Sequence, residues 1–193
     1  MSNIGGARIA GSSPARGRVI GDFYATAPET TRSILDEINL KGSILEPACG
    51  QGHISEILKE YYPNNEIVST DLYDRGFGET GIDFLTHDYG RKFDNIITNP
   101  PFKYMKQFAE RSLELATDKV VLFGKIQFLE SKSRKELFAD NKPKYVYVFS
   151  ERQHLYRNGK PFDENGKKWS TVICFAWFVW EKGFDGETTL RWL

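Results

Sequence analysis

Short apolar runs alternate along most of the chain with segments of helical periodicity. The runs are rich in β-branched and aromatic residues and predict strands at 42–47, 66–71, 82–85, 93–98, 119–124, 145–149 and 171–181. Apolar side chains three and four positions apart predict helices at 28–40, with Thr26 as its N-cap, 54–62, 103–116 and about 125–138. Such alternation is typical of a parallel sheet covered by helices.

The last two predicted strands are joined without a helix. Residues 150–170 are polar and rich in turn formers, so the strand at 171–181 is expected to return antiparallel. We therefore predict an α/β fold with a seven-stranded, mostly parallel sheet, an antiparallel last strand and helices on both faces. Residues 22–193 are expected to form one domain, and residues 1–21 a disordered basic tail.

Composition narrows the class of protein. A chain of 193 residues with 40% hydrophobic content can bury a core without disulfides or a structural metal. No run of 18 apolar residues and no secretory signal is found, so we expect no membrane contact and a cytoplasmic location. Cys49 and Cys174 indicate no zinc site, and no metal is predicted. The net charge is zero, but the second half of the chain is basic and the first half acidic.

EPACGQGH at 46–53 lies at a predicted turn from a strand to a helix. Gly50 and Gly52 would let the backbone approach a ligand, and the helix N-terminus presents unpaired amides. The stretch lacks the third glycine of a dinucleotide motif and the Gly-Lys of a P-loop. Asp71, about 20 residues further on, ends the next strand, where an acidic side chain accepts from ribose hydroxyls in nucleotide-binding folds. Together these features favour an adenosine-containing cofactor, although Asp71 could instead cap its strand.

A second acidic position lies at the end of the predicted strand at 82–85. Asp83 and Phe84 could accept from an adenine amino group and stack on its ring, while a solvated Asp beside a core Phe is the structural alternative. Asp88 is a competing candidate for the adenine contact.

NPPF at 99–102 follows the strand at 93–98, where ligands bind in open α/β sheets. Asn-Pro-Pro ends a strand effectively, but a strand ending needs neither two prolines nor a following aromatic residue. The Asn99 side-chain oxygen and the Pro100 carbonyl can each accept an N–H bond from a planar NH₂ group. Pro101 would stiffen the turn, and Phe102 would offer a stacking face. The pattern predicts methyl transfer to an amino or amide nitrogen.

Taken together, EPACGQGH, Asp71, Asp83-Phe84 and NPPF resemble S-adenosylmethionine-dependent N6-adenine DNA methyltransferases. FYATAP at 23–28 precedes both motifs and looks like the cofactor-carboxylate motif of the gamma arrangement. The resemblance covers roughly residues 22–150 and implies a Rossmann-like class I methyltransferase fold. The chain lacks a separate target-recognition domain and looks like short phage and prophage members, so a bacterial or phage-infected cytoplasm is expected.

The resemblance also implies a role for each matching residue. Those expected near the methionine end of S-adenosylmethionine are Tyr24, Thr26 and Pro28, with Ala27 departing from the usual Pro. Those expected to wrap the cofactor are Glu46, Pro47, Ala48, Gly50 and Gly52. Asp71 and Leu72 would hold the ribose, and Asp83 and Phe84 the adenine. Asn99, Pro100, Pro101 and Phe102 would form the catalytic turn, with Asn99 also near the cofactor.

Substrate contacts are expected from the loop at 150–170, because the strands on either side of it place it at the edge of the sheet that carries Asn99. Basic and aromatic residues interleave there, as suits phosphate contact and base stacking, although a solvated hairpin is an equal alternative. With Phe102 and Lys103, the predicted substrate-binding residues are Arg152, His154, Arg157, Phe162, Lys167 and Lys168.

The predicted function is transfer of a methyl group from S-adenosylmethionine to adenine N6 in DNA, with loose or short sequence specificity. A duplex base would have to be flipped out to reach the site. RNA adenine or a protein glutamine amide are alternative substrates, and Phe102 favours nucleic acid because protein-glutamine members more often carry NPPY. A non-catalytic cofactor- or DNA-binding phage accessory protein is the alternative from another class.

Overall fold

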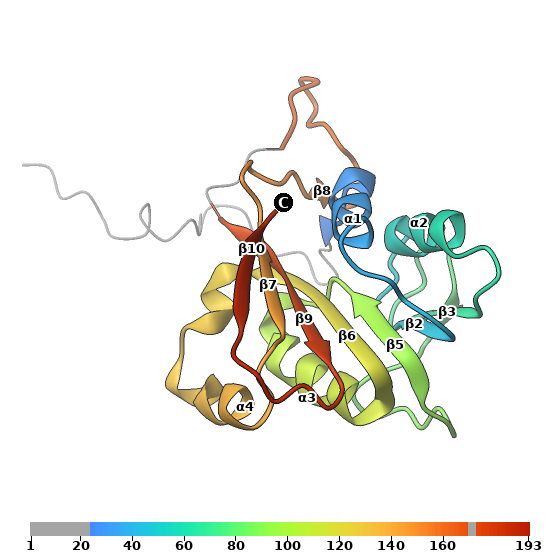
Figure 1. Ribbon diagram of the computed structural model, residues 1–193. Helices are drawn as coiled ribbons and strands as arrows, with labels where there is room; N and C mark the ends of the chain where they lie inside the picture. Colours follow the sequence, from blue (N-terminus) through green and yellow to red (C-terminus); the bar gives the residue numbers. More distant parts are fainter. Residues whose placement is uncertain (1–23, 170–172) are drawn as a thin grey trace, which may run out of the picture.

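The computed structural model describes residues 24–169 and 173–193, so the predicted tail at 1–21 lies outside the described residues. The centre of the protein is an eight-stranded sheet in the order β10-β7-β9-β6-β5-β2-β3-β4 (Figure 1). Its strands are β2 (Ile44–Glu46), β3 (Ile67–Asp71), β4 (Glu79–Thr80), β5 (Phe93–Thr98), β6 (Ala116–Lys125), β7 (Tyr145–Val148), β9 (Phe175–Glu181) and β10 (Thr189–Trp192). A separate two-stranded sheet pairs β1 (Tyr24–Ala25) with β8 (Tyr156–Arg157).

The direction of the strands matches the predicted α/β fold. β9 runs antiparallel to β6 and β7, and the other pairings of the large sheet are parallel. Two details of the prediction are wrong. An eighth strand, β10, extends the sheet beyond β7, and the short third strand is Glu79–Thr80 rather than 82–85. At 82–85 the chain turns instead, because the Asp83 carbonyl oxygen accepts from the backbone of Thr86 and His87.

Four α-helices lie beside the sheet: α1 (Pro28–Leu35), α2 (His53–Tyr61), α3 (Met105–Leu115) and α4 (Lys135–Asp140). Short 3-10 helices are η2 (Phe102–Tyr104), η3 (Ile126–Leu129) and η4 (Lys132–Arg134). Helix α1 ends earlier than predicted, since the Leu40 amide donates to the Tyr62 hydroxyl instead of a helical carbonyl. Its N-cap is Ala27 without a side-chain hydrogen bond, so the predicted cap at Thr26 is wrong. Within the described residues, no helix is long and apolar enough to cross a membrane.

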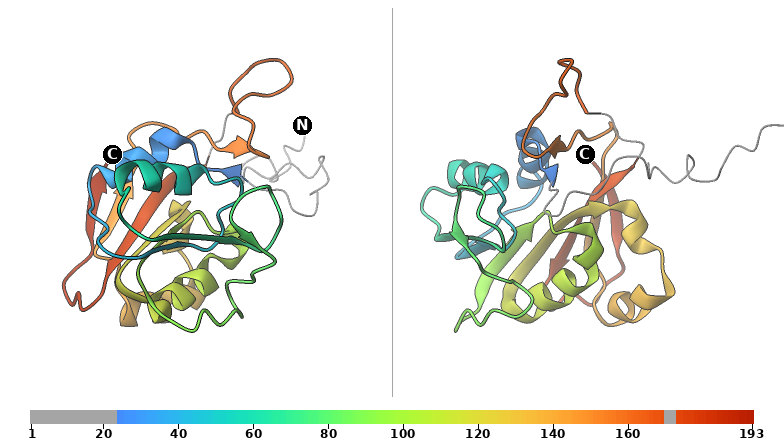
Figure 2. Two further views of the ribbon diagram at one scale, coloured as in Figure 1. Left: turned by 90° about the vertical axis from the view of Figure 1, so that its right-hand side faces the viewer. Right: turned by 180° about the vertical axis from the view of Figure 1, so that it is seen from behind.

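The central strands bury both of their faces. Along β5, β6 and β9, alternate side chains enter two separate core clusters, as the period of two in a strand requires. Ile96, Val120 and Phe178 pack in the cluster with α3 and α4, whereas Ile97 and Trp177 pack in the cluster with α1 and α2. Figure 2 shows the resulting three layers, with helices above and below the sheet. Two-sided burial explains why these strands read as continuous apolar runs.

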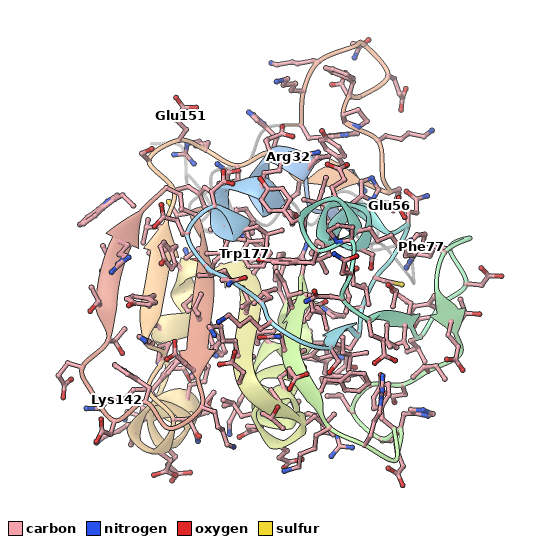
Figure 3. The ribbon with its side chains drawn as sticks, turned by 45° about the vertical axis from the view of Figure 1, so that its right-hand side comes forward. Arg32, Glu56, Phe77, Lys142, Glu151 and Trp177 are labelled. Carbon is pink, nitrogen blue, oxygen red and sulfur yellow. The ribbon has the colours of Figure 1, made fainter. Side chains whose placement is uncertain are left out.

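Trp177 joins the sheet to α1. Its side chain is fully buried, and its indole Nε1 donates to the Thr30 carbonyl oxygen at 3.0 Å. Figure 3 shows it between β9 and the helix. The bond ties β9 to α1, the helix that begins at Pro28, the last residue of FYATAP.

We expect Trp177→Phe to lower the free energy of unfolding by about 1–3 kcal/mol, because it leaves a gap and removes the donor to Thr30. Urea denaturation measures this change. Trp192→Phe is the matched control, since Trp192 is 70% exposed; we expect it to change stability by less than about 0.5 kcal/mol. Equal losses in the two variants would contradict this account of the layer contact.

Candidate active site

The predicted functional residues gather at one edge of the sheet. Asn99 follows β5, the glycine-rich turn follows β2, and Asp71 ends β3. These strands are parallel neighbours, so their carboxyl ends lie side by side. Among the described residues, no three His, Cys, Asp or Glu side chains lie close enough to hold a metal ion.

Asn99 is fixed by a hydrogen bond to a segment 75 positions away in the sequence. Its Nδ2 donates to the Tyr24 carbonyl oxygen at 2.9 Å. Because the amide nitrogen is engaged with the backbone, the other end of the amide, the acceptor Oδ1, has a set direction. Pro100 beside it is buried, while Pro101 is exposed. The turn thus carries a positioned side-chain acceptor on a stiff backbone.

Phe102 is less open than predicted. Its ring is half-buried at the start of η2 and packs against the Phe175 ring, with centroids 5.7 Å apart. The Lys125 ammonium lies over the same ring, 5.1 Å from its centroid. The ring therefore already has an aromatic and a cationic neighbour, and its use as a stacking face for a substrate stays a prediction. Lys103, the other substrate candidate beside it, is exposed.

The glycine-rich turn is held by Asp71. One carboxylate oxygen accepts from the Gly50 amide and the other from the Tyr73 amide, both at 2.8 Å. Asp71 is 7% exposed, whereas Leu72 after it is 48% exposed. Asp71 thus links the turn after β2 to the end of β3. This structural role is additional to the ribose contact that the sequence suggested. Each oxygen keeps a second lone pair for a ligand hydroxyl.

Glycine is required at position 52, because a neighbouring aromatic ring leaves no room for a side chain. It begins α2 with a φ of 86°, a left-handed conformation that favours glycine. A Cβ at this position would lie 2.6 Å from the Phe77 ring. Phe77 is labelled beside α2 in Figure 3, and its carbonyl oxygen accepts from Cys49 Sγ. The loop between β3 and β4 therefore packs directly onto the turn.

Glu46 lies beneath the turn rather than in contact with solvent. It is 1% exposed, and its carboxyl accepts from Ser55 Oγ. Burial, and to a smaller degree the charge of Asp71, raise the pKa of Glu46 to about 8. Burial also raises the pKa of the Cys49 thiol to about 12, which excludes it as a nucleophile at neutral pH. Of the wrapping residues, Pro47 is buried and Ala48 is half-buried.

FYATAP forms the wall opposite the turn. Tyr24 is 42% exposed, Thr26 is 2% exposed, and Pro28 starts α1. The hydroxyl of Thr26 is buried and has no hydrogen-bond partner among the described residues. Because a buried hydroxyl is costly without a partner, this atom fits a site that receives a polar ligand group. The residues present therefore fit a small ligand with a carboxylate and an adenosine.

The two adenine candidates are placed differently. The backbone amide of Ile82 donates to the Asp71 carbonyl oxygen. Asp83, the next residue, is exposed and therefore lies close in space to the carboxyl end of β3. Phe84 is 2% exposed and packs 4.9 Å from the Phe108 ring, so the structure places it in the core instead of on an open stacking face. Asp88 lies beyond the turn, and its Oδ1 accepts from the Gly90 amide. This placement favours Asp83 over Asp88 for a contact beside Asp71.

The loop at 150–170 reaches the site through its first half. Residues 153–160, here named the strap, include β8, which pairs with β1 and sets Arg157 opposite Tyr24. The Tyr156 ring lies 5.9 Å from His53, edge to face, and Gln153 Oε1 accepts from Thr30 Oγ1 at 2.6 Å. The strap, which was predicted to bind the substrate, thus also lies against the elements predicted to hold a cofactor.

The second half of the loop stands away from the body of the protein (Figure 2). Arg152, Lys167 and Lys168 are exposed, and Phe162 is 48% exposed. His154 Nδ1 lies 2.7 Å from the Trp169 carbonyl oxygen, so the structure gives it a role in shaping the loop. Arg157 is paired through its backbone with Tyr24, the residue that binds Asn99, while its guanidinium lies over the Trp169 ring at 5.8 Å, and the lysines lie at the tip.

Several contacts of the site could not be predicted from the sequence. They include the pairing of β1 with β8, Lys125 over Phe102, and Gly159 against Gln51. A Cβ on Gly159, whose φ is 74°, would lie 1.8 Å from Gln51 Oε1, so the strap fits closely on the glycine-rich turn. The dipeptide Asn158-Gly159 was a visible turn signal, but its partner was not visible.

The fold is that of class I Rossmann-like methyltransferases. Precorrin-6y C5,15-methyltransferase from Geobacter metallireducens GS-15 superposes with a TM-score of 0.56 at 14% identity, over 82% of this chain and 93% of that one. The predicted fold is therefore confirmed. S-adenosylmethionine is the cofactor of this class of fold, as the sequence predicted.

Sequence comparison also finds methyltransferases. The ribosomal RNA small subunit methyltransferase C of Haemophilus influenzae (strain PittGG) is 33% identical over 98 residues, in a match that covers 42% of this chain and 30% of the relative. The type II methyltransferase M.CvrRI of Paramecium bursaria Chlorella virus XZ-6E is 35% identical over 69 residues, in a match that covers 31% of this chain and 18% of the relative. The chain thus spans less than a third of the length of these relatives. No family model matches it.

The raised pKa of Glu46 generates a prediction about pH. The folded state holds a proton on Glu46 up to about pH 8, whereas the ordinary pKa is 4.5. Because the folded state binds the extra proton, this group's contribution to stability falls as pH rises from 4.5 to 8. Glu46→Gln, which does not titrate, should remove that decline, a difference on the order of a few kcal/mol.

Urea denaturation at pH 5, 6, 7 and 8 measures the effect as the difference between the wild type and Glu46→Gln. Exposed Glu56→Gln serves as the control, since Glu56 pairs with Lys59 at the surface. Parallel pH curves for the wild type and Glu46→Gln would show that Glu46 is ionised in the folded protein at pH 7.

Proposed function

We propose that the protein transfers a methyl group from S-adenosylmethionine to the N6 amino group of adenine in DNA. The observation that carries the proposal is the position of Asn99. Asn99 lies at the carboxyl end of β5, at the edge of the sheet where the cofactor is expected. Its amide nitrogen donates to the Tyr24 carbonyl oxygen, and its Oδ1 is left as an acceptor. Such an acceptor suits a planar NH₂ group, which has two N–H bonds to donate.

The chemistry needs no strong base at the moment of transfer. S-adenosylmethionine supplies an electrophilic methyl group on a sulfonium sulfur. Asn99 Oδ1 and the Pro100 carbonyl oxygen would each accept one N–H bond of the amino group. These two acceptors direct the lone pair of the nitrogen and stabilise the positive charge that develops on it. Pro101 limits the movement of both acceptors.

The cofactor would lie between FYATAP and the glycine-rich turn. Thr26, with its buried and unpaired hydroxyl, would receive the carboxylate of the methionine end. Asp71 would accept from the ribose hydroxyls with its remaining lone pairs, and Asp83 from the adenine amino group. Tyr24 would line the methionine end with Pro28, above the turn formed by Ala48 and Gly50. Glu46 and Gly52 would support the turn from below.

DNA is the proposed substrate because of the basic residues around Asn99 and the resemblance of the motifs. Arg157 of β8 is paired with Tyr24, and Lys103 and Lys125 flank Phe102. Clustered positive charge suits contact with a phosphate backbone. The similarity to a ribosomal RNA methyltransferase supports RNA as a substrate, and RNA adenine, which carries the same amino group, is the second candidate. A protein glutamine amide has the same NH₂ group and is the third.

We expect Asn99→Ala to lower the rate of methyl transfer at least 100-fold, since it removes an acceptor that acts on the developing charge. The measurement is incorporation of label from methyl-labelled S-adenosylmethionine into unmethylated DNA, ribosomal RNA and protein extract in parallel. Exposed Asn64→Ala is the matched control and should keep full activity.

Three outcomes of that experiment differ. Label in DNA that survives Asn99→Ala would refute the proposed mechanism. Label in RNA or protein but not in DNA would show that DNA is not the substrate and that the labelled molecule is. Bound cofactor without label in any of the three would indicate a non-catalytic binding protein.

We expect Asp71→Ala to weaken S-adenosylmethionine binding by about tenfold or more, with a smaller effect on turnover at saturating cofactor. The carboxylate has a double role, since it holds the turn through Gly50 and would accept from the ribose. Calorimetry gives the dissociation constant. Asp74→Ala, an exposed residue of the next loop, is the control. An unchanged dissociation constant in Asp71→Ala would remove Asp71 from the cofactor site.

A further inference from the structure

The strap is anchored on the wall of the site that FYATAP and α1 form. Its residue Tyr156 is paired through the backbone with Ala25 of β1, and Gln153 Oε1 accepts from Thr30 Oγ1 at 2.6 Å. Between these two contacts, Leu155 is 8% exposed and belongs to the core cluster that includes residues of α1 and α2. In Figure 1, β8 accordingly lies beside α1. A strand pairing, a side-chain hydrogen bond and a buried side chain therefore hold the first half of the strap.

The same segment touches the opposite wall, which consists of the glycine-rich turn and the start of α2. The Tyr156 ring meets the His53 ring edge to face, with the ring centroids 5.9 Å apart. The φ values of Asn158 and Gly159, 50° and 74°, turn the chain there. Gly159 approaches Gln51 so closely that a Cβ would overlap the Gln51 side-chain oxygen. The strap therefore extends from one wall of the proposed cofactor site to the other.

Each wall carries a buried polar atom that has no hydrogen-bond partner among the described residues. These atoms are Thr26 Oγ1 and His53 Nδ1. Thr26 follows Ala25, the strand partner of Tyr156, and the Tyr156 ring contacts His53, so the strap passes next to both walls at these atoms. Burial lowers the pKa of His53, so its imidazole is neutral at pH 7 and Nδ1 can donate or accept. Unpaired polar atoms on opposite walls fit a polar ligand enclosed between them.

We propose that the strap closes the cofactor site, and that S-adenosylmethionine enters and leaves only while the strap is lifted from the glycine-rich turn. This inference rests on the proposed position of the cofactor and adds the strap and His53 to its site. The contacts of the strap join parts of the chain to one another, so the strap closes in the free protein as well as over the cofactor. The pairing of β1 with β8, one ring contact and the fit of Gly159 are few enough to open locally without unfolding the sheet.

A cover of this kind has a kinetic signature. A closed strap blocks entry and exit alike, so both rate constants of cofactor exchange depend on the fraction of molecules in which the strap is open. Weakening its contact with the turn raises the association and the dissociation rate constants together. A residue that only binds the cofactor behaves differently, since its loss accelerates dissociation and leaves association nearly unchanged. The two rate constants therefore distinguish a cover from an ordinary binding contact.

The test is Gly159→Leu, which places a branched side chain against Gln51. Gly166→Leu is the matched control, because Gly166 has a φ of 72°, close to the 74° of Gly159, but a Cβ there would meet nothing within 4 Å. Rapid filtration with tritium-labelled S-adenosylmethionine gives the association rate constant, and a chase with unlabelled cofactor gives the dissociation rate constant. Relative to the control, we expect both rate constants to rise about tenfold in Gly159→Leu, as overpacking weakens the closed state. The dissociation constant should change much less than either rate constant.

Amide hydrogen exchange at residues 156–160 shows independently whether the strap has opened. We expect exchange at these amides to be about tenfold faster in Gly159→Leu than in the wild type, and unchanged in Gly166→Leu. Faster exchange with both rate constants unchanged would overturn the proposal. Faster dissociation with unchanged association would also overturn it, since the strap would then be a binding contact only.

A second variant serves if Gly159→Leu does not fold. Gln153→Ala removes the acceptor of the Thr30 hydroxyl, and we expect it to raise both rate constants by about threefold. Exposed Glu151→Ala is its control. These measurements need no methyl acceptor: if DNA receives no label but both rate constants rise as expected, the proposed function fails and the role of the strap stands. A wild type that binds no S-adenosylmethionine would overturn both.

Discussion

The hydrogen bond from Asn99 to the Tyr24 carbonyl oxygen is the contact on which the site depends. It connects the end of β5 to β1, and β1 in turn pairs with β8 of the strap. The end of β5, β1 and β8, which are far apart in the sequence, are thus connected by one side-chain hydrogen bond and one strand pairing. Because the nitrogen end of the Asn99 amide is engaged, its oxygen has one direction. A catalytic acceptor needs such a fixed direction before the substrate arrives.

Buried carboxyl groups hold the second wall of the site. Asp71 accepts two backbone amides and so determines the path of the glycine-rich turn, while Glu46 lies beneath the turn against Ser55. A carboxyl in such a place stabilises only if its oxygens are hydrogen-bonded. Asp71 meets that condition with amides, and Glu46 meets it with a hydroxyl and with a raised pKa.

Much of the fold could be predicted from the chain, and the failures have physical causes. The hydrophobic pattern identified six of the main strands, because burial on both faces produces a clear apolar run. The antiparallel direction of β9 was predicted from the polar segment at 150–170, which has no helix. It misplaced β4, because a two-residue edge strand buries almost nothing: Glu79 and Thr80 are both exposed. It missed β10 for the same reason, since all four residues from Thr189 to Trp192 are exposed. Backbone pairing at an edge leaves no mark in the hydrophobic pattern.

The sequence by itself determined which candidate groups come to this end of the sheet. NPPF, the glycine-rich turn and the acidic strand ends are local patterns, and each places its groups by strand direction and backbone stiffness alone. The tertiary structure decided which groups are available: Phe84 entered the core, Phe102 acquired Phe175 and Lys125 as neighbours, and the strap settled on Gln51 and His53. These contacts join residues far apart in the chain, and their identity depends on packing that no short stretch of sequence encodes.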